Sequence, residues 1–463
     1  MENSTPMEWA QVQFGQAKLN DPRRTQRLIS MAASLASQPG VAVSKLAISP
    51  ADMEGAYRFI RNDQIQPSDI AESGFQATAQ HAQDHPLLLA LEDTTSLTYQ
   101  HRSVRDTLGH TNQGNRSRAL LAHSILLFAP DTHQVVGLIE QQRWSRDISK
   151  RGQGHQHASR PYKEKESYKW EKASQNMSAR LGEHLSSVIS VCDREADIYE
   201  YLTYKTEQQQ RFVVRSMQSR CIKEHDQKLY DYSNKLPVAG IKTLNISQRG
   251  GRKARDVKLE IRYTSVTLKA PANKASEPDI PLNYVSCIEC GEGKNKLAWH
   301  LLTSEVINSY DDAIAVISYY EHRWLVEDYH KVWKTSGTDV EALRMQCADN
   351  LERMSVILAF IATRLLQLRF MKHIEPKSSS MSCEKVLGHK AWKLLWVKTM
   401  GRPLPSQVPD THWAYENLAK LGGWKDTKRT GRASVQVLWE GWFKLQTILE
   451  GYELAMSLEH GDL

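Results

Sequence analysis

No stretch of about 18 consecutive apolar residues occurs in this 463-residue sequence, so no helix is predicted to cross a membrane. The N-terminal stretch MENSTPMEWAQVQFGQ lacks the cationic start and the apolar centre of a secretion signal. We therefore expect no membrane partner and a cytoplasmic location.

Cysteine is scarce, with six residues scattered along the chain, and free thiols are expected rather than disulfides. Cys287 and Cys290 form a Cys-x-x-Cys pair, which is half of a zinc-binding pattern. Because no second pair follows at a suitable spacing, we interpret this pair as incidental. The sequence does not indicate any other role for Cys287 and Cys290.

Several motifs of common enzymes are also missing. The sequence has no P-loop, no GxGxxG and no Ser/His/Asp order. No motif therefore supports nucleotide binding or catalysis by a Ser/His/Asp triad. Internal repeats and long low-complexity tracts are absent as well. The net charge of +7 permits a polyanionic partner. Basic residues gather in the segments 145–165, 248–258 and 425–432.

Residues 1–75 have the pattern of a helical domain. Asp21-Pro22 predicts a helix start, with Asp as the N-cap and Pro at the first helical position. Arg27 follows in the first turns of that helix, and Arg58 and Arg61 share a face of a later one. Small basic helices of this kind suit DNA phosphates, and a plain helical bundle is the alternative.

From residue 86 the pattern changes to an α/β order of strand, strand, strand, helix, strand, helix, strand. The strands expected at 119–130 and 134–144 are antiparallel neighbours of the first. We interpret 217–305 as a β-rich insertion, 350–370 as an apolar helix against the sheet and 371–410 as an irregular linker. Residues 412–457 hold two or three amphipathic helices, whose Trp439 and Trp442 pack in a core or on a partner.

The segment Tyr319–Thr335 contains no Gly or Pro and is predicted to be a helix. At 100° per residue, one face presents a tyrosine, a carboxylate and three cations. Such a face suits a site that meets both metal and phosphate, although it is also typical of a solvated helix surface. The residues of this face are Tyr320, Arg323, Glu327, Lys331 and Lys334.

Three carboxylates stand out. Asp93 and Asp193 each end an apolar strand, and ligand sites in α/β folds form at such edges. If the two strands are adjacent, both aspartates can share Mg²⁺, and Glu327 completes a two-metal site. Glu92, Glu195 and Asp197 are neighbouring acids that remain alternatives, although strand parity and the strand-end position favour Asp93 and Asp193. His123 and His330 are interpreted as structural or DNA-adjacent.

Segments along almost the whole chain resemble the DDE transposases of the insertion-sequence-four group. They include DPRRTQRL, LALEDTTSLTY, VISVCDREADIY, the Tyr-Arg-Glu-Lys signature that ends at Lys334, NLERM and LGGWKDTKRTG. The resemblance implies an RNase H-like core (76–370) with its insertion at about 217–305. It further implies a DNA-binding N-terminal domain (1–75) and a helical C-terminal dimerisation domain (371–463).

The resemblance also assigns roles to residues. The catalytic and metal-binding triad falls on Asp93, Asp193 and Glu327, with two Mg²⁺ ions that Mn²⁺ can replace. Trp299 and Trp324 match aromatic residues near a flipped base, where stacking offsets the cost of flipping. The contacts with double-stranded DNA fall on Tyr320, Arg323, Lys331, Lys334, Arg215, Trp299, Trp324, Arg27 and Arg61.

The expected function is that of a cut-and-paste transposase. By analogy with the family, a homodimer pairs two transposon ends, water frees a 3′-OH, a hairpin forms and reopens, and the 3′-OH attacks target DNA. A bacterial, nucleoid-associated protein is implied. The alternatives are an RNase H-like nuclease, which cuts without joining, and a catalytically silent DNA-binding inhibitor. The end sequence, the target preference and self-inhibition are not encoded in recognisable motifs.

Overall fold

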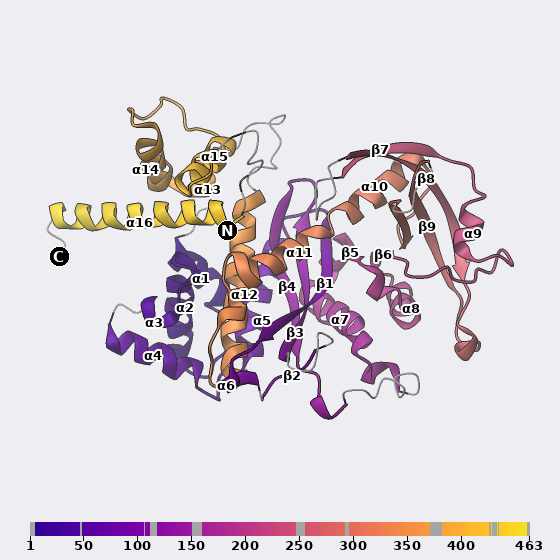
Figure 1. Ribbon diagram of the computed structural model, residues 1–463, viewed down its shortest axis with the longest axis horizontal. Helices are drawn as coiled ribbons and strands as arrows, with labels where there is room; N and C mark the ends of the chain where they lie inside the picture. The colour runs from indigo at the N-terminus through magenta and orange to yellow at the C-terminus, as the bar shows by residue number, and fades with distance from the viewer. Residues whose placement is uncertain are drawn as a thin grey trace.

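A computed structural model describes residues 5–46, 49–105, 107–111, 118–150, 160–246, 255–291, 296–370, 382–425, 427, 433 and 435–460. Figure 1 shows a long sheet, with the helices of both chain ends gathered beside one end of it. The strands are β1 Leu88–Tyr99, β2 Gly109–His110, β3 Arg118–Ala129, β4 Gln134–Trp144, β5 Val188–Cys192, β6 Arg211–Arg215, β7 Gly240–Ile246, β8 Arg255–Leu268, β9 Ile280–Glu289 and β10 Ala298–Thr303.

The strands within the described ranges join into one mixed sheet of ten strands, in the order β2-β3-β1-β5-β6-β10-β9-β8-β7, with β4 paired to β3. β3 lies antiparallel to β1 and to β4, whereas β1, β5 and β6 run parallel. The predicted α/β class is therefore confirmed, with helices flanking one large mixed sheet. Of the two strands expected beside β1, only β3 pairs with it directly.

The predicted β-rich insertion continues the core sheet instead of forming a separate one. β10 pairs antiparallel with β6, and β9, β8 and β7 extend the sheet outward from there. The short helix α9 Leu229–Ser233 lies beside these strands, and Figure 1 shows them at the end of the sheet opposite the chain termini.

The alternation of side chains gives the sheet two different faces. Leu89 and Leu91 of β1 join the large core beneath the later helices. Leu88 and Ala90 face the other way, into a core shared with α7. The helices after the insertion are α10 Tyr310–Glu321, α11 Trp324–Lys331, a π-helix Val332–Ser336 and α12 Ala348–Phe370, and the helices α7 Lys169–Leu181 and α8 Tyr199–Glu207 cover the second face.

The N-terminal helices are held against α12. Asp21 caps α2 as predicted, since its side chain accepts a hydrogen bond from the backbone N–H of Arg23. Arg353 of α12, only 2% exposed, donates to the carbonyl oxygens of Ile60 and Ile65. The predicted domain boundary at residue 75 falls inside α5. These helices are α1 Pro6–Phe14, α2 Pro22–Ser37, α3 Val43–Leu46, α4 Pro50–Ile60 and α5 Pro67–Ala82.

The C-terminal region is more helical than predicted. The expected linker at 371–410 contains α13 Glu384–Leu387 and α14 His389–Met400, while 371–381 lies outside the described residues. The expected amphipathic helices are α15 Thr411–Leu421 and α16 Val435–His460. Trp439 and Trp442 of α16 are buried, so their stripe belongs to the core. Further along α16, Leu454 and Leu458 are 59% and 66% exposed.

The predicted helix Tyr319–Thr335 is interrupted in two places. Between α10 and α11, the backbone N–H groups of His322 and Arg323 bond three residues back, to Tyr319 and Tyr320, as in a 3₁₀ turn. After Lys331 the helix widens into the π-helix. Both irregularities change which way the side chains point. π-Turns of this kind are frequent at functional sites.

None of the helices that the structure describes is long and apolar enough to span a membrane. All six cysteines are free thiols, as expected.

Candidate active site

Asp93 and Asp193 lie on neighbouring parallel strands. The pairing of β1 with β5 ends at Leu91 opposite Val191, and the same register places Asp93 opposite Asp193. Both aspartates have the parity of the face that carries α11, and adjacent strands lie roughly 4.8 Å apart. The prediction that Asp93 ends its strand is wrong, because β1 continues to Tyr99 beside β3. It lies where the pairing with β5 ends.

The neighbouring acids occupy other places. Glu92 points to the opposite face, is fully buried and lies 3.5 Å from His123. Asp197 is buried and accepts hydrogen bonds from Arg220, which makes it an anchor for the following loop. Glu195 is exposed and pairs with Lys169. Parity therefore separates Asp93 from Glu92.

Arg323 lies among the three predicted carboxylates. Its Nη2 donates a hydrogen bond of 2.6 Å to Oε1 of Glu327, and its Nη1 is 4.0 Å from Oδ1 of Asp93. Its positive charge also acts on Asp193. Within the described ranges, the buried Nε and Nη1 of Arg323 have no hydrogen-bond partner. The guanidinium is thus a cation with unused donors, in contact with Glu327 and 4.0 Å from Asp93.

The two aspartates titrate differently. Burial alone raises the pKa of Asp93, but His330 and Arg323 more than offset it, so this pKa is lower than usual. Burial and the charge of nearby Asp93 raise the pKa of Asp193, against a hydrogen bond from the backbone of Glu195. Two carboxylates so close in a partly dry site favour a bound cation.

The three side chains suit a hard divalent cation in their chemistry, since all are carboxylates with oxygen ligands, and two of them already face the guanidinium of Arg323. Among the residues with a described position, no three His, Cys, Asp or Glu side chains are already close enough to hold a metal ion.

The other predicted residues of the broken helix differ in exposure. Tyr320, expected on the presented face, is buried and packs edge-on against Trp299 at 5.2 Å between ring centroids. Lys331 is exposed and pairs with Asp328. Lys334 lies in the π-helix, and burial lowers its pKa while the charges of Glu341 and Asp93 oppose this.

Trp324 and Arg215 lie nearby on the same side of the sheet. Trp324 is 45% exposed, and the Arg323 guanidinium lies 5.2 Å from the centre of its ring. Arg215 ends β6 and donates a hydrogen bond to the carbonyl oxygen of Ala298, next to Trp299. The exposed indole of Trp324 thus lies beside Arg323, and Arg215 lies beside the strand that carries Trp299.

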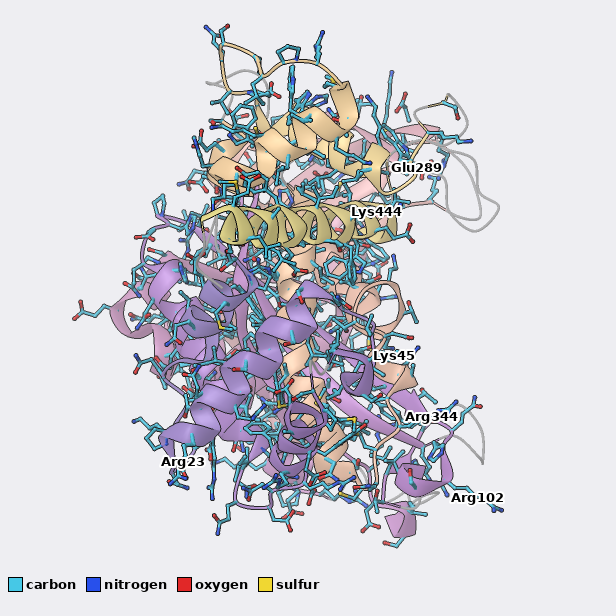
Figure 2. The ribbon with its side chains drawn as sticks, turned by 90° about the vertical axis from the view of Figure 1, so that its left-hand side faces the viewer. Arg23, Lys45, Arg102, Glu289, Arg344 and Lys444 are labelled. Atoms are coloured by element: carbon cyan, nitrogen blue, oxygen red, sulfur yellow. The ribbon has the colours of Figure 1, made fainter. Side chains whose placement is uncertain are left out.

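Arg27 and Arg61 belong to the N-terminal helices. Arg27 pairs with Asp52 at 2.5 Å. Arg61 is the C-cap residue of α4, and its guanidinium lies 5.2 Å from the centre of the Tyr57 ring. Figure 2 shows Arg23 and Lys45 at the outer surface on this side of the molecule. Arg61 is exposed, whereas Arg27 already has a partner and must exchange it to contact DNA.

Sequence reasoning missed part of this site. His330, interpreted as structural or DNA-adjacent, has its Nδ1 3.4 Å from Oδ2 of Asp93. Ser124 and Gln141 lie behind it on β3 and β4. The one available signal was that His330 follows Glu327 by three residues on a helix, which places both on neighbouring positions of one face.

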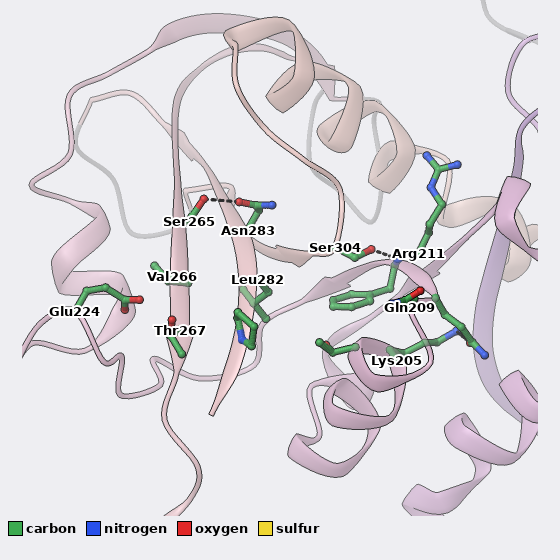
Figure 3. Close-up of a pocket in the computed structure, with 14 residues that line it drawn as sticks. Lys205, Gln209, Arg211, Glu224, Ser265, Val266, Thr267, Leu282, Asn283 and Ser304 are labelled. Atoms are coloured by element: carbon green, nitrogen blue, oxygen red, sulfur yellow. Dashed lines mark hydrogen bonds between the residues drawn. The ribbon is translucent and has the colours of Figure 1, made fainter. Parts of the chain in front are cut away.

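A separate cavity of about 530 Å³ lies at the opposite end of the parallel strands, where β6 begins (Figure 3). Lys205, Arg211, Glu224, Thr267, Asn283 and Ser304 are among its lining residues. Its cations are already engaged, because Arg211 pairs with Glu305 and Lys205 donates to Ser190 and Gln210. The cavity is therefore not part of the carboxylate site.

Comparison with known proteins gives a partial match. Residues 6–65, which form α1 to α4, match a sequence family described as transposase DNA-binding. A solved structure, described as a piggyBac transposase synaptic complex with hairpin DNA from cryo-electron microscopy, is similar at a TM-score of 0.41. The two chains are 11% identical, with 88% of this chain and 87% of that chain covered. So low a score adds nothing to the strand order as evidence for the fold.

Proposed function

We propose that this protein is a DNA transposase that cleaves DNA ends and joins them to target DNA. Its catalytic residues would be Asp93, Asp193 and Glu327. The observation that supports the proposal is that Arg323 contacts Glu327 and approaches Asp93, while the register of β1 with β5 places Asp193 opposite Asp93. The match of residues 6–65 to a transposase DNA-binding family supports DNA as the substrate.

Asp93, Asp193 and Glu327 would hold two Mg²⁺ ions, or Mn²⁺ in their place. The ions would lower the pKa of the attacking water or 3′-OH and would stabilise the negative charge on the leaving oxygen. Phosphate gives Arg323 an alternative partner to Glu327, because its unused Nε and Nη1 can donate to a phosphate oxygen. Lys334 adds a second positive charge near Asp93. Trp324 exposes a ring on which an unpaired base can stack.

The reaction sequence follows the family that the motifs resemble. Hydrolysis frees a 3′-OH, this hydroxyl attacks the opposite strand to form a hairpin, water reopens the hairpin, and the same hydroxyl attacks target DNA. Each step exchanges one phosphodiester or water oxygen for another at phosphorus, so no redox partner is needed. A single site can perform all four steps because the attacking and leaving oxygens exchange roles.

A homodimer is the proposed active assembly. The last turns of α16 leave Tyr452, Leu454 and Leu458 exposed on a helix that extends past the body of the molecule (Figure 1). Exposed leucines at i and i+4 form a stripe that a second copy of the same helix can cover. Two copies would bring two DNA ends together.

The test uses duplex oligonucleotides from the two ends of the DNA element that encodes the chain, with a supercoiled plasmid as target. We expect strand cleavage, a hairpin product that resists denaturation, and joined products in Mg²⁺. Asp193→Ala should abolish all three while end binding in a gel-shift assay remains. Glu195→Ala is the matched control, since this adjacent acid faces solvent.

The outcomes separate the alternatives. Cleavage without any joined product would indicate a nuclease. End binding without cleavage by the unaltered chain would indicate a silent DNA-binding protein. Full cleavage by Asp193→Ala would contradict the assignment of the carboxylates. For the dimer, Leu454→Glu with Leu458→Glu should abolish the paired-end complex and leave single-end binding, with the exposed Leu404→Glu as control.

A further inference from the structure

A row of polar side chains crosses three strands beneath α11. Asp93 is directly opposite Ser124 on β3, which is in turn opposite Gln141 on β4. His330 of α11 lies above this row, with Nδ1 3.4 Å from Oδ2 of Asp93 and Nε2 3.2 Å from Oγ of Ser124. Ser124 is fully buried and His330 is 5% exposed. The mechanism above uses none of the residues behind Asp93.

The hydrogen-bond directions along this row follow from Arg143. Its guanidinium only donates, and it donates to Oε1 of Gln141, so the other amide atom of Gln141 is an NH₂ group. This NH₂ donates to Oγ of Ser124 and to the hydroxyl of Tyr329. Ser124 therefore has its own hydrogen available for Nε2 of His330.

This arrangement determines which nitrogen of His330 carries a hydrogen. The ionised carboxylate of Asp93 only accepts hydrogen bonds, so a neutral ring that bonds to it carries its hydrogen on Nδ1, and Nε2 then accepts from Ser124. A protonated ring carries hydrogens on both nitrogens and presents the same group to Asp93. In either state a donor points at Oδ2, although 3.4 Å is longer than an ordinary hydrogen bond.

We propose that His330 is a positioning residue for the carboxylate site, and this proposal rests on the proposed function. It holds Oδ2 of Asp93 in place and leaves Oδ1, the oxygen nearest Arg323, to bind metal. His330 also follows Glu327 by three residues on α11, so the contact with Asp93 sets the distance between two of the three carboxylates. The row from Arg143 to Asp93 thus transmits the position of β4 to the metal ligands.

The same residues bind α11 to the sheet. Tyr329, next to His330, is fully buried and accepts a hydrogen bond from Gln141. Arg143 in turn pairs with Glu352 of α12 through Nε at 3.0 Å. The helix that carries Glu327 is therefore fixed at the level of His330 by a buried network. Outer partners of metal ligands commonly change metal affinity 10–100-fold when they are removed.

The experiment compares two amide substitutions. His330→Asn places an NH₂ group near the position of Nδ1 and should keep the contact with Asp93. His330→Gln extends its amide towards the position of Nε2 and should lose it. Mn²⁺ binding to the full-length chain is titrated with and without duplex end DNA. The Mg²⁺ dependence of cleavage and the midpoint of urea unfolding are measured alongside.

We expect His330→Gln to raise the Mn²⁺ concentration for half-saturation at least tenfold, and His330→Asn to stay within about threefold of the unaltered chain. Ser124→Ala should raise it by a smaller factor, because the ring remains but loses its fixed orientation. Urea midpoints for the two His330 variants should agree, since both replace the ring with an amide of smaller volume.

The result that overturns the inference is equal Mn²⁺ affinity in His330→Gln and the unaltered chain, or an equal loss in both His330 variants. Failure of the proposed function has a different signature. In that case Asp93→Asn and Asp193→Asn do not reduce the Mn²⁺ binding of the chain. This result does not depend on the residue at position 330.

Discussion

The side chain of Glu327 is held by Arg323, one turn earlier in the chain, through a 2.6 Å hydrogen bond from Nη2 to Oε1. The cation lies at the N-terminal end of α11, where it also approaches Asp93. The carboxylates are thus neutralised from within the chain when no other cation is present. Anything that binds there has to compete with this guanidinium, which leads to the first prediction.

Removing the guanidinium should separate metal binding from catalysis. In Arg323→Ala, Glu327 and Asp93 lose their internal counter-ion, so Mn²⁺ in the absence of DNA should bind about tenfold more tightly, the equivalent of one charge-assisted hydrogen bond. Cleavage should nevertheless be lost, because phosphate loses its donor. Isothermal titration and a cleavage assay measure the two effects.

The control for this prediction is Arg323→Lys, which keeps the charge but not the planar donor fork. It should show metal affinity close to that of the unaltered chain. Weaker Mn²⁺ binding by Arg323→Ala would show that the arginine supports the metal site rather than occupying it.

The parts of this site that the sequence predicts are those governed by backbone periodicity. Asp93 and Asp193 share a face because each lies two residues after a paired apolar position, and side chains alternate along strands. Parity alone separated Asp93 from Glu92. The approach of α11 to that face follows from its apolar stripe, which includes the buried Val326 and Tyr329.

What could not be predicted depends on tertiary partners. Helical periodicity placed Tyr320 on the presented face, but the 3₁₀ turn after α10 changes the phase, and Tyr320 packs on Trp299. The role of His330 depends on Ser124, which is 206 residues away in the chain. Three prolines at 403, 405 and 409 suggested an irregular linker, yet α14 ends before them at Met400. Proline only determines where a helix cannot continue.

The exposed ring of Trp324 should contribute to holding DNA. Stacking of a base on an aromatic ring contributes about 1–3 kcal/mol, so Trp324→Ala should weaken binding of an end with an unpaired base by roughly 5–150-fold. Trp324→Phe should retain most of the affinity. Binding is measured by fluorescence anisotropy with fully paired and locally unpaired duplexes.

The matched control for Trp324 is Trp299, whose ring is already packed against Tyr320. Trp299→Phe should lower the free energy of unfolding more than it lowers affinity for DNA. Equal binding of both duplex types by Trp324→Ala and the unaltered chain would eliminate the stacking role.

The attachment of the N-terminal helices should depend on Arg353. This buried guanidinium donates to Ile60, Ile65 and Asn350, so Arg353→Ala leaves several polar groups unpaired. We expect a loss of about 3–5 kcal/mol in the free energy of unfolding, as for other broken buried networks. Arg58→Ala, at a side chain that is 76% exposed, should change it by less than about 0.5 kcal/mol.

Urea unfolding followed by tryptophan fluorescence measures this loss, and limited proteolysis locates it. In Arg353→Ala, residues 5–65 should be digested first, because their contact with α12 is weakened. A variant as stable as the unaltered chain would show that the apolar contacts of α12 are sufficient to hold the N-terminal helices.

His300 should make the stability of the insertion depend on pH. Burial, assisted by the positive charge of Arg215, lowers the pKa of His300 from 6.5 to about 4. The folded chain therefore binds fewer protons at this site than the unfolded chain between these two values. Stability should fall as the pH decreases from about 6.5 to about 4, and the site contributes no further change below that range.

The size of this effect is at most about 3.5 kcal/mol, since the pKa is lowered by about 2.5 units and each unit corresponds to about 1.4 kcal/mol. His300→Gln cannot be protonated, so the difference between its free energy of unfolding and that of the unaltered chain should change with pH across this window. Urea titrations at pH 7.5 and pH 4.5 measure the difference. His225→Gln, which replaces an exposed histidine beside Tyr232, is the control and should leave the pH dependence unchanged. If the pH dependence of His300→Gln matches that of the unaltered chain, the ring of His300 is solvated enough to take up a proton in the folded state, and its stacking on Tyr230 at 3.7 Å does not exclude water.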